Sequence, residues 1–317
     1  MKNVTQSYVG VDVSKKKLDI HIYPNNETFC VDNTKKGIEK ISKRLKIINV
    51  AKVMLEASGG YERLAVTTLS RNYNTYLVNP KRVRDFRKAS GKKAKTDPVD
   101  ASLIAKFAAN DCSENIMPLN EKDVLLSDLF KRKQELKKML SAEKNRLEKK
   151  SNKAIEREID VHIRFLKRRI KKIDTEIKNI IKSVESYKRK KEIIESMPGV
   201  GNETAQGIIS DLPEAGEIDG KSLASLVGLA PQTNESGQFV GHAKIGKGRS
   251  EPRKLLYMAA LSAIKHNPVL KSFYNRLREK GKPFKVAIVA IMRKMIVILN
   301  TMLRKNEMWR LEPDMSE

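Results

Sequence analysis

The chain has 317 residues, and its 64 lysines and arginines against 38 acidic residues give a formal net charge of +26. An excess of this size excludes the balanced surface of an ordinary metabolic enzyme and predicts a polyanionic partner. Aromatic residues make up only 5% of the chain, which favours phosphate backbones over a membrane surface as that partner. The length exceeds the roughly 250–300 residues at which one hydrophobic core stops growing, so we expect more than one folding unit.

Cysteines and apolar runs indicate the cellular setting. The two cysteines, Cys30 and Cys112, lack C-x-x-C spacing, which excludes a disulfide framework and favours a reducing cytoplasm. The sequence opens without an apolar signal core, and its longest apolar run, Val286 to Met292, is shorter than the roughly 20 residues that a membrane span requires. We therefore expect a cytoplasmic protein with no membrane partner.

Residues 1–115 alternate short strands with helices. Apolar alternation predicts strands over Tyr8–Val13, Lys17–Tyr23, Glu27–Asn33, Lys52–Ala57 and Thr75–Asn79. Helices are predicted over Thr34–Ile48, from Gly59-Gly60 onward, and over Pro80–Ala89 and Asp97–Asn110. This order predicts an α/β domain in which helices cover a mixed sheet.

Residues 121–195 have the pattern of a coiled coil. Two interleaved apolar series repeat every seven residues: Ile159, Leu166, Ile173 and Ile180, and Ile163, Ile170, Ile177 and Val184. Lys133 and Glu143 interrupt a less regular series before them, and Ser151-Asn152 is a candidate turn between two arms. The pattern leaves open whether the arms form a hairpin in one chain or a rod between chains.

The coiled-coil segment is also strongly basic. Between Lys131 and Lys191 there are 23 basic and nine acidic residues, an excess of 14. A coiled coil usually mixes the two signs on its outer positions, so this excess predicts polyanion binding rather than an ordinary solvated face. The candidate contacts are Lys167, Arg168, Arg169, Lys171 and Lys172.

Four acids stand where carboxylates are unusual or lie close together. Asp12 and Glu56 fall in apolar strands, where an unpaired carboxylate costs several kcal/mol. Asp97 and Asp100 are three residues apart on the first turn of a predicted helix, where Asp97 could also be a plain N-cap. Together they are hard oxygen ligands suited to Mg²⁺, or to Mn²⁺, and to phosphodiester chemistry. The alternative is four surface or capping acids.

Residues 196–317 form a third predicted part, mainly helical. The turn Met197–Gly201 before a helix over Glu203–Asp211 resembles a helix-hairpin-helix, in which Gly199 and Gly201 would let backbone N–H groups approach a phosphate. The alternative is a tight turn between two helices. A Gly-Pro-rich stretch reaches Arg249, and helices return over Pro252–Arg304.

Three segments resemble a known family: Val9–Lys15, Glu56–Tyr61 and Lys95–Ala101. They look like the RuvC-like domain of the DEDD-type insertion-sequence transposases, relatives of the Piv DNA invertase. The resemblance implies a ribonuclease-H-like fold for about residues 1–115, with Asp12, Glu56, Asp97 and Asp100 as a metal-binding tetrad.

Gly228–Pro231, Glu235–Gly237 and Gly241–Arg249 resemble the second, transposase domain of the same family. The resemblance implies that Ser236 is the nucleophile, with Ser250 as a weaker rival, although a Ser-Gly pair by itself is usually a turn. Cations that would hold the scissile phosphate are Lys244, Lys247, Arg249 and Arg253. Gly241–Lys247 begins like a P-loop, but Gly248 follows where Ser or Thr is needed, so we do not expect a nucleotidase.

The family implies a DNA recombinase that mobilises an insertion sequence through a phosphoserine intermediate. It also implies double-stranded donor and target DNA, a structured non-coding guide RNA, and a homo-oligomer, a dimer or tetramer that we expect to assemble through the coiled coil, near the nucleoid. Two rival functions remain open: a metal-dependent junction nuclease that uses water, and a non-catalytic nucleic-acid scaffold.

Overall fold

A computed structural model describes residues 6–90, 97–110, 120–149, 152–231, 235–236, 239–240, 245–246 and 248–310, and at 97–99, 235–236 and 239–240 it describes the backbone alone. The chain divides into two compact units, Met1–Leu125 and Leu126–Glu317. Each is described by itself. The finer division into residues 1–115, 121–195 and 196–317 stays a prediction.

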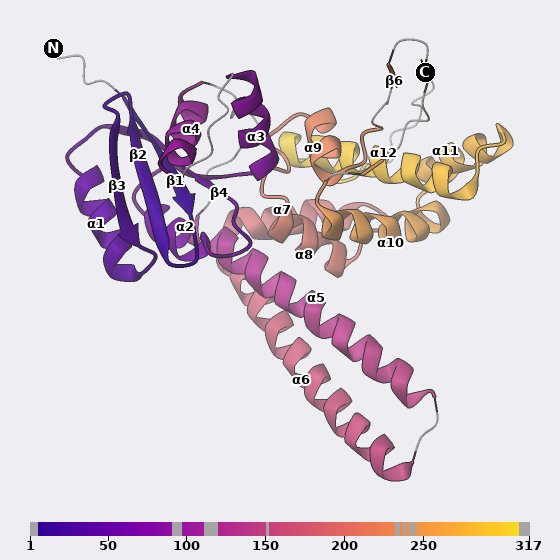
Figure 1. Ribbon diagram of the computed structural model, residues 1–317. Coiled ribbons are helices and arrows are strands. Elements are labelled where there is room, and N and C mark those ends of the chain that lie inside the picture. The colour runs from indigo at the N-terminus through magenta and orange to yellow at the C-terminus, as the bar shows by residue number, and fades with distance from the viewer. Residues whose placement is uncertain are drawn as a thin grey trace. The chain divides into compact units, whose positions relative to one another are not determined.

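A mixed sheet forms the centre of the first unit, as the sequence predicts (Figure 1). Its strands are β1 (Ser7–Val13), β2 (Lys17–Tyr23), β3 (Glu27–Asp32), β4 (Val50–Glu56) and β5 (Thr75–Val78), in the order β3-β2-β1-β4-β5. The first three strands are antiparallel to one another, whereas β1, β4 and β5 run parallel. The parallel part brings the carboxyl ends of β1 and β4 to the same edge of the sheet.

Helices cover both faces of this sheet. Alternate residues of β1, Val9, Val11 and Val13, pack in one core with α1 (Lys35–Leu45) and α2 (Arg63–Leu69). The opposite face, with Met54 and Val78, packs against α3 (Pro80–Ala89) and α4 (Asp97–Ala109). The predicted α/β class is confirmed for this unit, and the assignment to the ribonuclease-H-like fold stays a proposal.

A long antiparallel helical hairpin projects from the second unit (Figure 1). Its arms are α5 (Glu121–Leu147) and α6 (Lys153–Ser183), and the Asn152 side chain caps α6 by accepting a hydrogen bond from the N–H of Ala154. Leu136 of α5 and Leu166 of α6 belong to the same buried core. Of the two alternatives, a hairpin in one chain and a rod between chains, the structure shows the hairpin, with both arms packed within one chain.

The predicted apolar seam is largely buried inside this hairpin. Ile163, Leu166, Ile173 and Ile177 are all less than 9% exposed, and Leu166 is 1% exposed. Our expectation that chains assemble through this seam is therefore wrong for these residues, because the other arm of the same chain already covers them. The supercoil that the heptads imply stays a prediction.

The two polar interruptions of the seam are buried and paired. Lys133 is 2% exposed, and its ammonium donates to Asp174 at 2.6 Å and to Gln206 at 2.7 Å, with Glu203 at 2.9 Å. Burial acts to raise the pKa of Asp174, but the hydrogen bonds from Lys133 and Lys178 outweigh it and lower that pKa to about 2. Lys133 thus ties both arms of the hairpin to the helix that carries Glu203 and Gln206.

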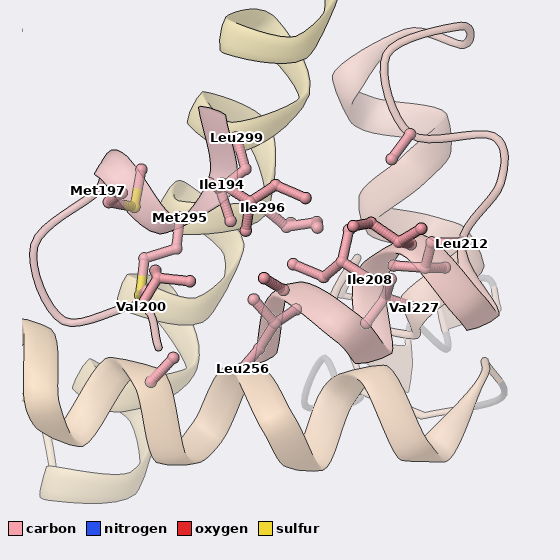
Figure 2. Close-up of a cluster of buried hydrophobic side chains, with 14 of the residues drawn as sticks. Ile194, Met197, Val200, Ile208, Leu212, Val227, Leu256, Met295, Ile296 and Leu299 are labelled. Carbon is pink, nitrogen blue, oxygen red and sulfur yellow. The ribbon is translucent and has the colours of Figure 1, made fainter. Parts of the chain in front are cut away.

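The rest of the second unit is a helical layer around one core. Its elements are α7 (Glu185–Ser196), α8 (Asn202–Asp211), α9 (Gly220–Val227), the short strands β6 (Glu235–Ser236) and β7 (Phe239–Val240), α10 (Ser250–His266), α11 (Pro268–Glu279) and α12 (Phe284–Lys305). Figure 2 shows side chains from α7, α8, α10 and α12 meeting in the core, among them Ile194, Ile208, Leu256 and Met295. The predicted helices return as expected, and α9 is an addition that the sequence analysis missed.

Among the described residues, α12 is long and apolar enough to cross a membrane by length and composition. Half of the apolar stretch is buried inside the unit. Met295, Ile296 and Leu299 of this helix lie in the core of Figure 2. Burial within the unit explains the apolar composition of α12.

Candidate active site

Two of the candidate acids lie at the carboxyl ends of neighbouring parallel strands. Asp12 is the last residue but one of β1, and Glu56 ends β4. The residues before these acids, Val11 and Leu55, are paired with each other across the two strands. Because side chains alternate along a strand, Asp12 lies on the face opposite Val11 and Val13, the face that α4 covers. Both acids are half-buried. The sequence-based placement of these two carboxylates in the sheet is confirmed.

A glycine sets the distance between α4 and β1. A Cβ atom at Gly10 would lie 2.3 Å from the carbonyl oxygen of Ala101 and 2.3 Å from the backbone nitrogen of Ala105. Both are backbone atoms of α4, so no side chain is accommodated here. Gly10 and Asp12 share a face of β1, and α4 therefore rests directly beside Asp12. The sequence analysis included Gly10 in a motif but gave it no packing role; a glycine inside a strand was the available signal.

The first turn of α4 brings Asp100 to this face. Asp100 is half-buried, and its carboxylate forms an ion pair with Arg87 from the last turn of α3. The backbone of Asp97 begins α4 as predicted, and its side chain lies outside the described part of the chain. Arg87 therefore supplies a counter-charge to Asp100 that the sequence analysis did not identify.

The charges of Asp12 and Asp100 act on the carboxyl group of Glu56. Burial raises the pKa of Glu56 above its ordinary value, and the charges of Asp12 and Asp100 raise it further. Arg87 and Arg84 oppose this shift through their own charges. The acids of β1, β4 and α4 are therefore close enough to repel one another across a half-buried space.

This repulsion and the oxygen ligands fit a hard divalent cation. Within the described residues, however, no group of three or more His, Cys, Asp or Glu side chains is arranged to hold a metal ion. The fit is thus one of donor chemistry and charge, with Arg87 present as the nearest cation to Asp100. Metal binding by this tetrad remains a proposal.

A buried carboxylate shapes the segment after Glu56. Glu62 accepts hydrogen bonds from the N–H of Ser58 at 3.1 Å, the hydroxyl of Ser58 at 2.9 Å and the N–H of Gly60 at 2.9 Å. Burial acts to raise the pKa of Glu62, but these hydrogen bonds outweigh it and the pKa is lowered. The bound turn delays α2 to Arg63, so the predicted helix start at Gly59-Gly60 is wrong.

The candidate nucleophile lies in a small strand pair. Ser236 ends β6 and is paired with Phe239 of β7 in an antiparallel register. The stretch that contains this pair runs from Gly228 to Gly248, and its two ends lie in close backbone contact. A Cβ at Gly248 would lie 2.2 Å from the nitrogen of Gly228. Gly228 ends α9 with a φ of 78°, a left-handed conformation that favours glycine. Ser250 instead begins α10.

A half-buried ion pair fixes the far end of this stretch. Arg249 donates to both carboxylate oxygens of Glu214, at 2.6 and 2.7 Å, and to the carbonyl of Asp211 at 2.5 Å. Glu214 is 6% exposed. Two hydrogen bonds from one guanidinium to one carboxylate form a strong bidentate arrangement. Arg253 donates to the carbonyl of Val227 at 3.2 Å. Both arginines thus have structural partners, and their contacts with a scissile phosphate stay predictions, as do those of Lys244 and Lys247, which lie outside the described residues.

The predicted phosphate-binding turn joins α7 and α8. Gly199 has a φ of 96°, and a Cβ there would lie 2.4 Å from the Cα of Ala263 on α10, so packing within the unit requires this glycine. Gly201 is the exposed N-cap of α8 and has no atom within 4 Å of an added Cβ. Open space at a helix N-terminus is compatible with an anion. The helix-hairpin-helix assignment stays a prediction.

The basic cluster lies on the outer face of α6. Its five members are exposed: Lys167, Arg168, Arg169, Lys171 and Lys172. In the described part of the chain none of them forms an ion pair with a carboxylate, unlike their neighbour Lys178, which pairs with Asp174. The charge is therefore available to an external anion, and nucleic-acid contact by these residues is a proposal.

Two family models match the chain. A transposase model of the IS110 DEDD type covers residues 9–150, and the model of the transposase IS116/IS110/IS902 family covers residues 191–275. The chain belongs to the IS110 transposase family. The first match spans all four candidate acids of this IS110 transposase, and the second spans Ser236 with the turn at Gly199.

Relatives of known name agree with this family. Pilin gene-inverting proteins of Moraxella bovis and Moraxella lacunata are each 27% identical over 314 residues, covering 96% of this IS110 transposase and 97% of the relative. An uncharacterized 42 kDa protein of the insertion element IS900 from Mycobacterium paratuberculosis is 32% identical over 154 residues, 45% of this chain and 38% of that protein. The chain is accordingly an enzyme of the DNA transposase and recombinase class, and DNA is its substrate.

Proposed function

We propose that this enzyme moves an insertion sequence by forming a phosphoserine bond to DNA. Asp12, Glu56, Asp97 and Asp100 bind Mg²⁺, or Mn²⁺ in its place, and Ser236 is the nucleophile. The observation that supports the metal site most directly is that the charges of Asp12 and Asp100 raise the pKa of Glu56. Acids that repel one another beside a DNA-binding enzyme's sheet edge need a cation before a phosphate can approach.

The chain's own residues have distinct tasks in this proposal. When bound, the metal ion supplies Lewis-acid stabilisation of charge on the phosphate. Gly10 and the turn at Glu62 hold the acids in place, and the Gly228–Gly248 contact holds the ends of the stretch that carries Ser236. The Ser236 oxygen forms a bond to phosphorus, the bond from phosphorus to a deoxyribose oxygen breaks, and the serine proton passes through water to that oxygen, which leaves as a hydroxyl group. The phosphodiester energy is kept in the phosphoserine, so no ATP is required.

The partners of the reaction follow from charge and family. Double-stranded donor and target DNA are bound through phosphate contacts, in which the exposed cluster of α6 takes part. A structured RNA encoded by the element pairs with both DNAs, so that base pairing supplies the sequence specificity. The enzyme acts as a dimer or tetramer in the cytoplasm, close to the nucleoid, through surfaces other than the buried seam of the hairpin.

The metal site is tested by Asp12→Asn, which keeps the side-chain shape but removes an anionic ligand. We expect normal thermal unfolding and DNA binding but loss of strand cleavage in Mg²⁺, with Glu56→Gln, Asp97→Asn and Asp100→Asn acting in the same direction. Asp32→Asn, a matched change at the exposed end of β3, should cleave normally. Normal cleavage by Asp12→Asn would place the metal site elsewhere.

The nucleophile is tested by Ser236→Ala on a denaturing gel of labelled DNA. We expect neither a protease-sensitive covalent adduct nor recombinant product, whereas Ser250→Ala, at the start of α10, should give both. Undiminished nicking without an adduct would favour a water-using junction nuclease. DNA binding without cleavage by the wild type, with unchanged binding by all five variants, would favour a non-catalytic scaffold.

A further inference from the structure

A cavity of about 570 Å³ lies between α11, α12 and the segment that follows α12. Its apolar wall comes from Val297, Ile298 and Met302, and the single tryptophan of the chain, Trp309, closes one side. This volume is in the range of about 300–1,000 Å³ that small ligands occupy in proteins. None of these residues has a part in the proposed metal site or the serine chemistry.

Cations gather at one end of the cavity. The Lys294 ammonium lies 4.6 Å from the ring centroid of Phe273, and the guanidinium carbon of Arg276 lies 5.3 Å from the same ring. Burial lowers the pKa of Lys294, and the positive charge of Arg276 lowers it further. Within the described residues neither cation forms an ion pair with a carboxylate. An anionic group placed at this end would relieve the repulsion.

The cavity also has a positive rim and an aromatic residue in its lining. Lys305 and Arg310 add two further cations, against Glu307 as the described acid of the lining. The indole Nε1 of Trp309 is buried, with no hydrogen-bond partner among the described residues. The backbone of Trp309 is anchored, because its N–H donates to the Ser196 hydroxyl at 2.8 Å, and the side chain packs against the hydrophobic core of the unit. A ligand with a flat apolar ring and a negative charge matches these features.

We propose that this cavity receives one unpaired nucleotide of a DNA or RNA strand, with its base against Trp309 and the apolar wall and its phosphate at Arg276 and Lys294. Proteins bind single strands by this combination of aromatic stacking and cationic contacts. The proposal rests on the proposed function only in that the enzyme binds nucleic acid. It needs neither the metal site nor Ser236.

The test uses the fluorescence of Trp309, which reports on this cavity alone because the chain has no other tryptophan. The full-length enzyme is titrated in EDTA with a short oligothymidylate, an oligouridylate, and the same backbone with abasic residues. We expect both base-bearing strands to quench the emission and the abasic strand to leave it unchanged. Quenching by either strand supports the proposal, and the tighter of the two identifies the source.

Variants locate the binding within the cavity. Lys294→Gln and Phe273→Leu should each weaken the affinity for the single strand, measured by quenching, roughly tenfold, which is the usual contribution of one stacked base with its contacts. Lys285→Gln is the matched control, because it removes an exposed cation from the same helix outside the cavity. Thermal unfolding of each variant confirms that it is folded before titration.

Other results would overturn the proposal. Equal quenching by the abasic strand would leave only phosphate binding, and emission that depends on protein concentration without nucleic acid would show that a second copy fills the cavity. Binding of a labelled strand without any quenching would refute the cavity but leave nucleic-acid binding intact. Absence of all binding, to duplex as well, would refute the proposed function itself.

Discussion

The contact between Gly10 and α4 can be tested by adding one methyl group. In Gly10→Ala the new Cβ would lie 2.3 Å from the carbonyl oxygen of Ala101 and 2.9 Å from the Cα of Ala105. Ordinary contacts of carbon atoms are about 3.5 Å, so α4 has to move by about 1 Å, since backbone atoms cannot rotate away as a side chain can.

Two effects follow from this displacement. Overpacking of this kind costs about 1–3 kcal/mol, which lowers the thermal midpoint of a unit of this size by roughly 3–6 °C per kcal/mol. Because α4 carries Asp97 and Asp100, the acids on the helix also separate from Asp12. A misplacement of about 1 Å can reduce a rate by about 100-fold. We therefore expect Gly10→Ala to bind DNA normally and to cleave about 100-fold more slowly.

The measurements are calorimetric unfolding and Mg²⁺-dependent strand cleavage at a temperature where the variant is folded. Gly207→Ala is the matched control, because its Cβ would meet the ends of the Leu255 and Phe130 side chains, 2.1 and 2.9 Å away, which can adjust. That variant should lose stability but keep cleavage. Wild-type stability together with wild-type cleavage in Gly10→Ala would refute the role given to this contact.

Four further predictions concern the second unit. Leu166→Asp with Ile173→Asp should unfold the hairpin, seen as lost helical circular dichroism, since each buried side chain contributes roughly 1.5–3 kcal/mol; a change in mass alone would contradict the intramolecular seam. Lys133→Met should destabilise the unit by about 1–3 kcal/mol, which is less than the roughly 3–5 kcal/mol lost when a fully buried ion pair is broken. The loss is smaller because Asp174 and Glu203 are 22% and 35% exposed, and because each keeps another lysine as a partner. The pKa of Asp174 in the folded protein is about 2, below its ordinary 3.8. The wild type should therefore keep the stability contributed by this carboxylate above about pH 4 and lose it toward pH 2, as measured by urea titrations. An equally steep loss in Lys133→Met would show that the acid sensitivity arises elsewhere. Finally, duplex affinity should fall steeply with salt, by about 0.9 in log K per phosphate contact for each decade, and glutamine at Lys167, Arg168, Arg169, Lys171 and Lys172 should make that slope shallower; weaker binding with the same slope would instead indicate misfolding.

The sequence predicted those features of the first unit that depend on local pattern. Period-two alternation located β2 to the residue, and the helix starts predicted at Thr34 and Pro80 lie within one residue of the observed ones. Asp12 and Glu56 could be recognised as unusual because a carboxylate between apolar strand residues is costly. These signals involve neighbours in the chain only.

The features that sequence analysis missed depend on distant residues. Gly10 is required by the backbone of α4 some 90 positions later, and Arg87 pairs with Asp100 across two helices. The helix α9 begins with a glycine and depends on the Asp219 side chain, which caps Lys221 and Ser222; the surrounding glycines and prolines concealed it. A heptad pattern is likewise the same for a hairpin and a rod, because both bury the same side chains.

The fixed ends of the Ser236 stretch have a consequence for how this protein can change. Gly228 and Gly248 hold the two ends together by backbone contact, and Arg249 anchors the second end to Glu214. Once its ends are held, doubling the length of a loop costs only about 0.6 kcal/mol. Insertions and substitutions between the two glycines, apart from Ser236, should therefore be tolerated by the helical core, so the length and composition of that stretch can change while the scaffold retains its stability.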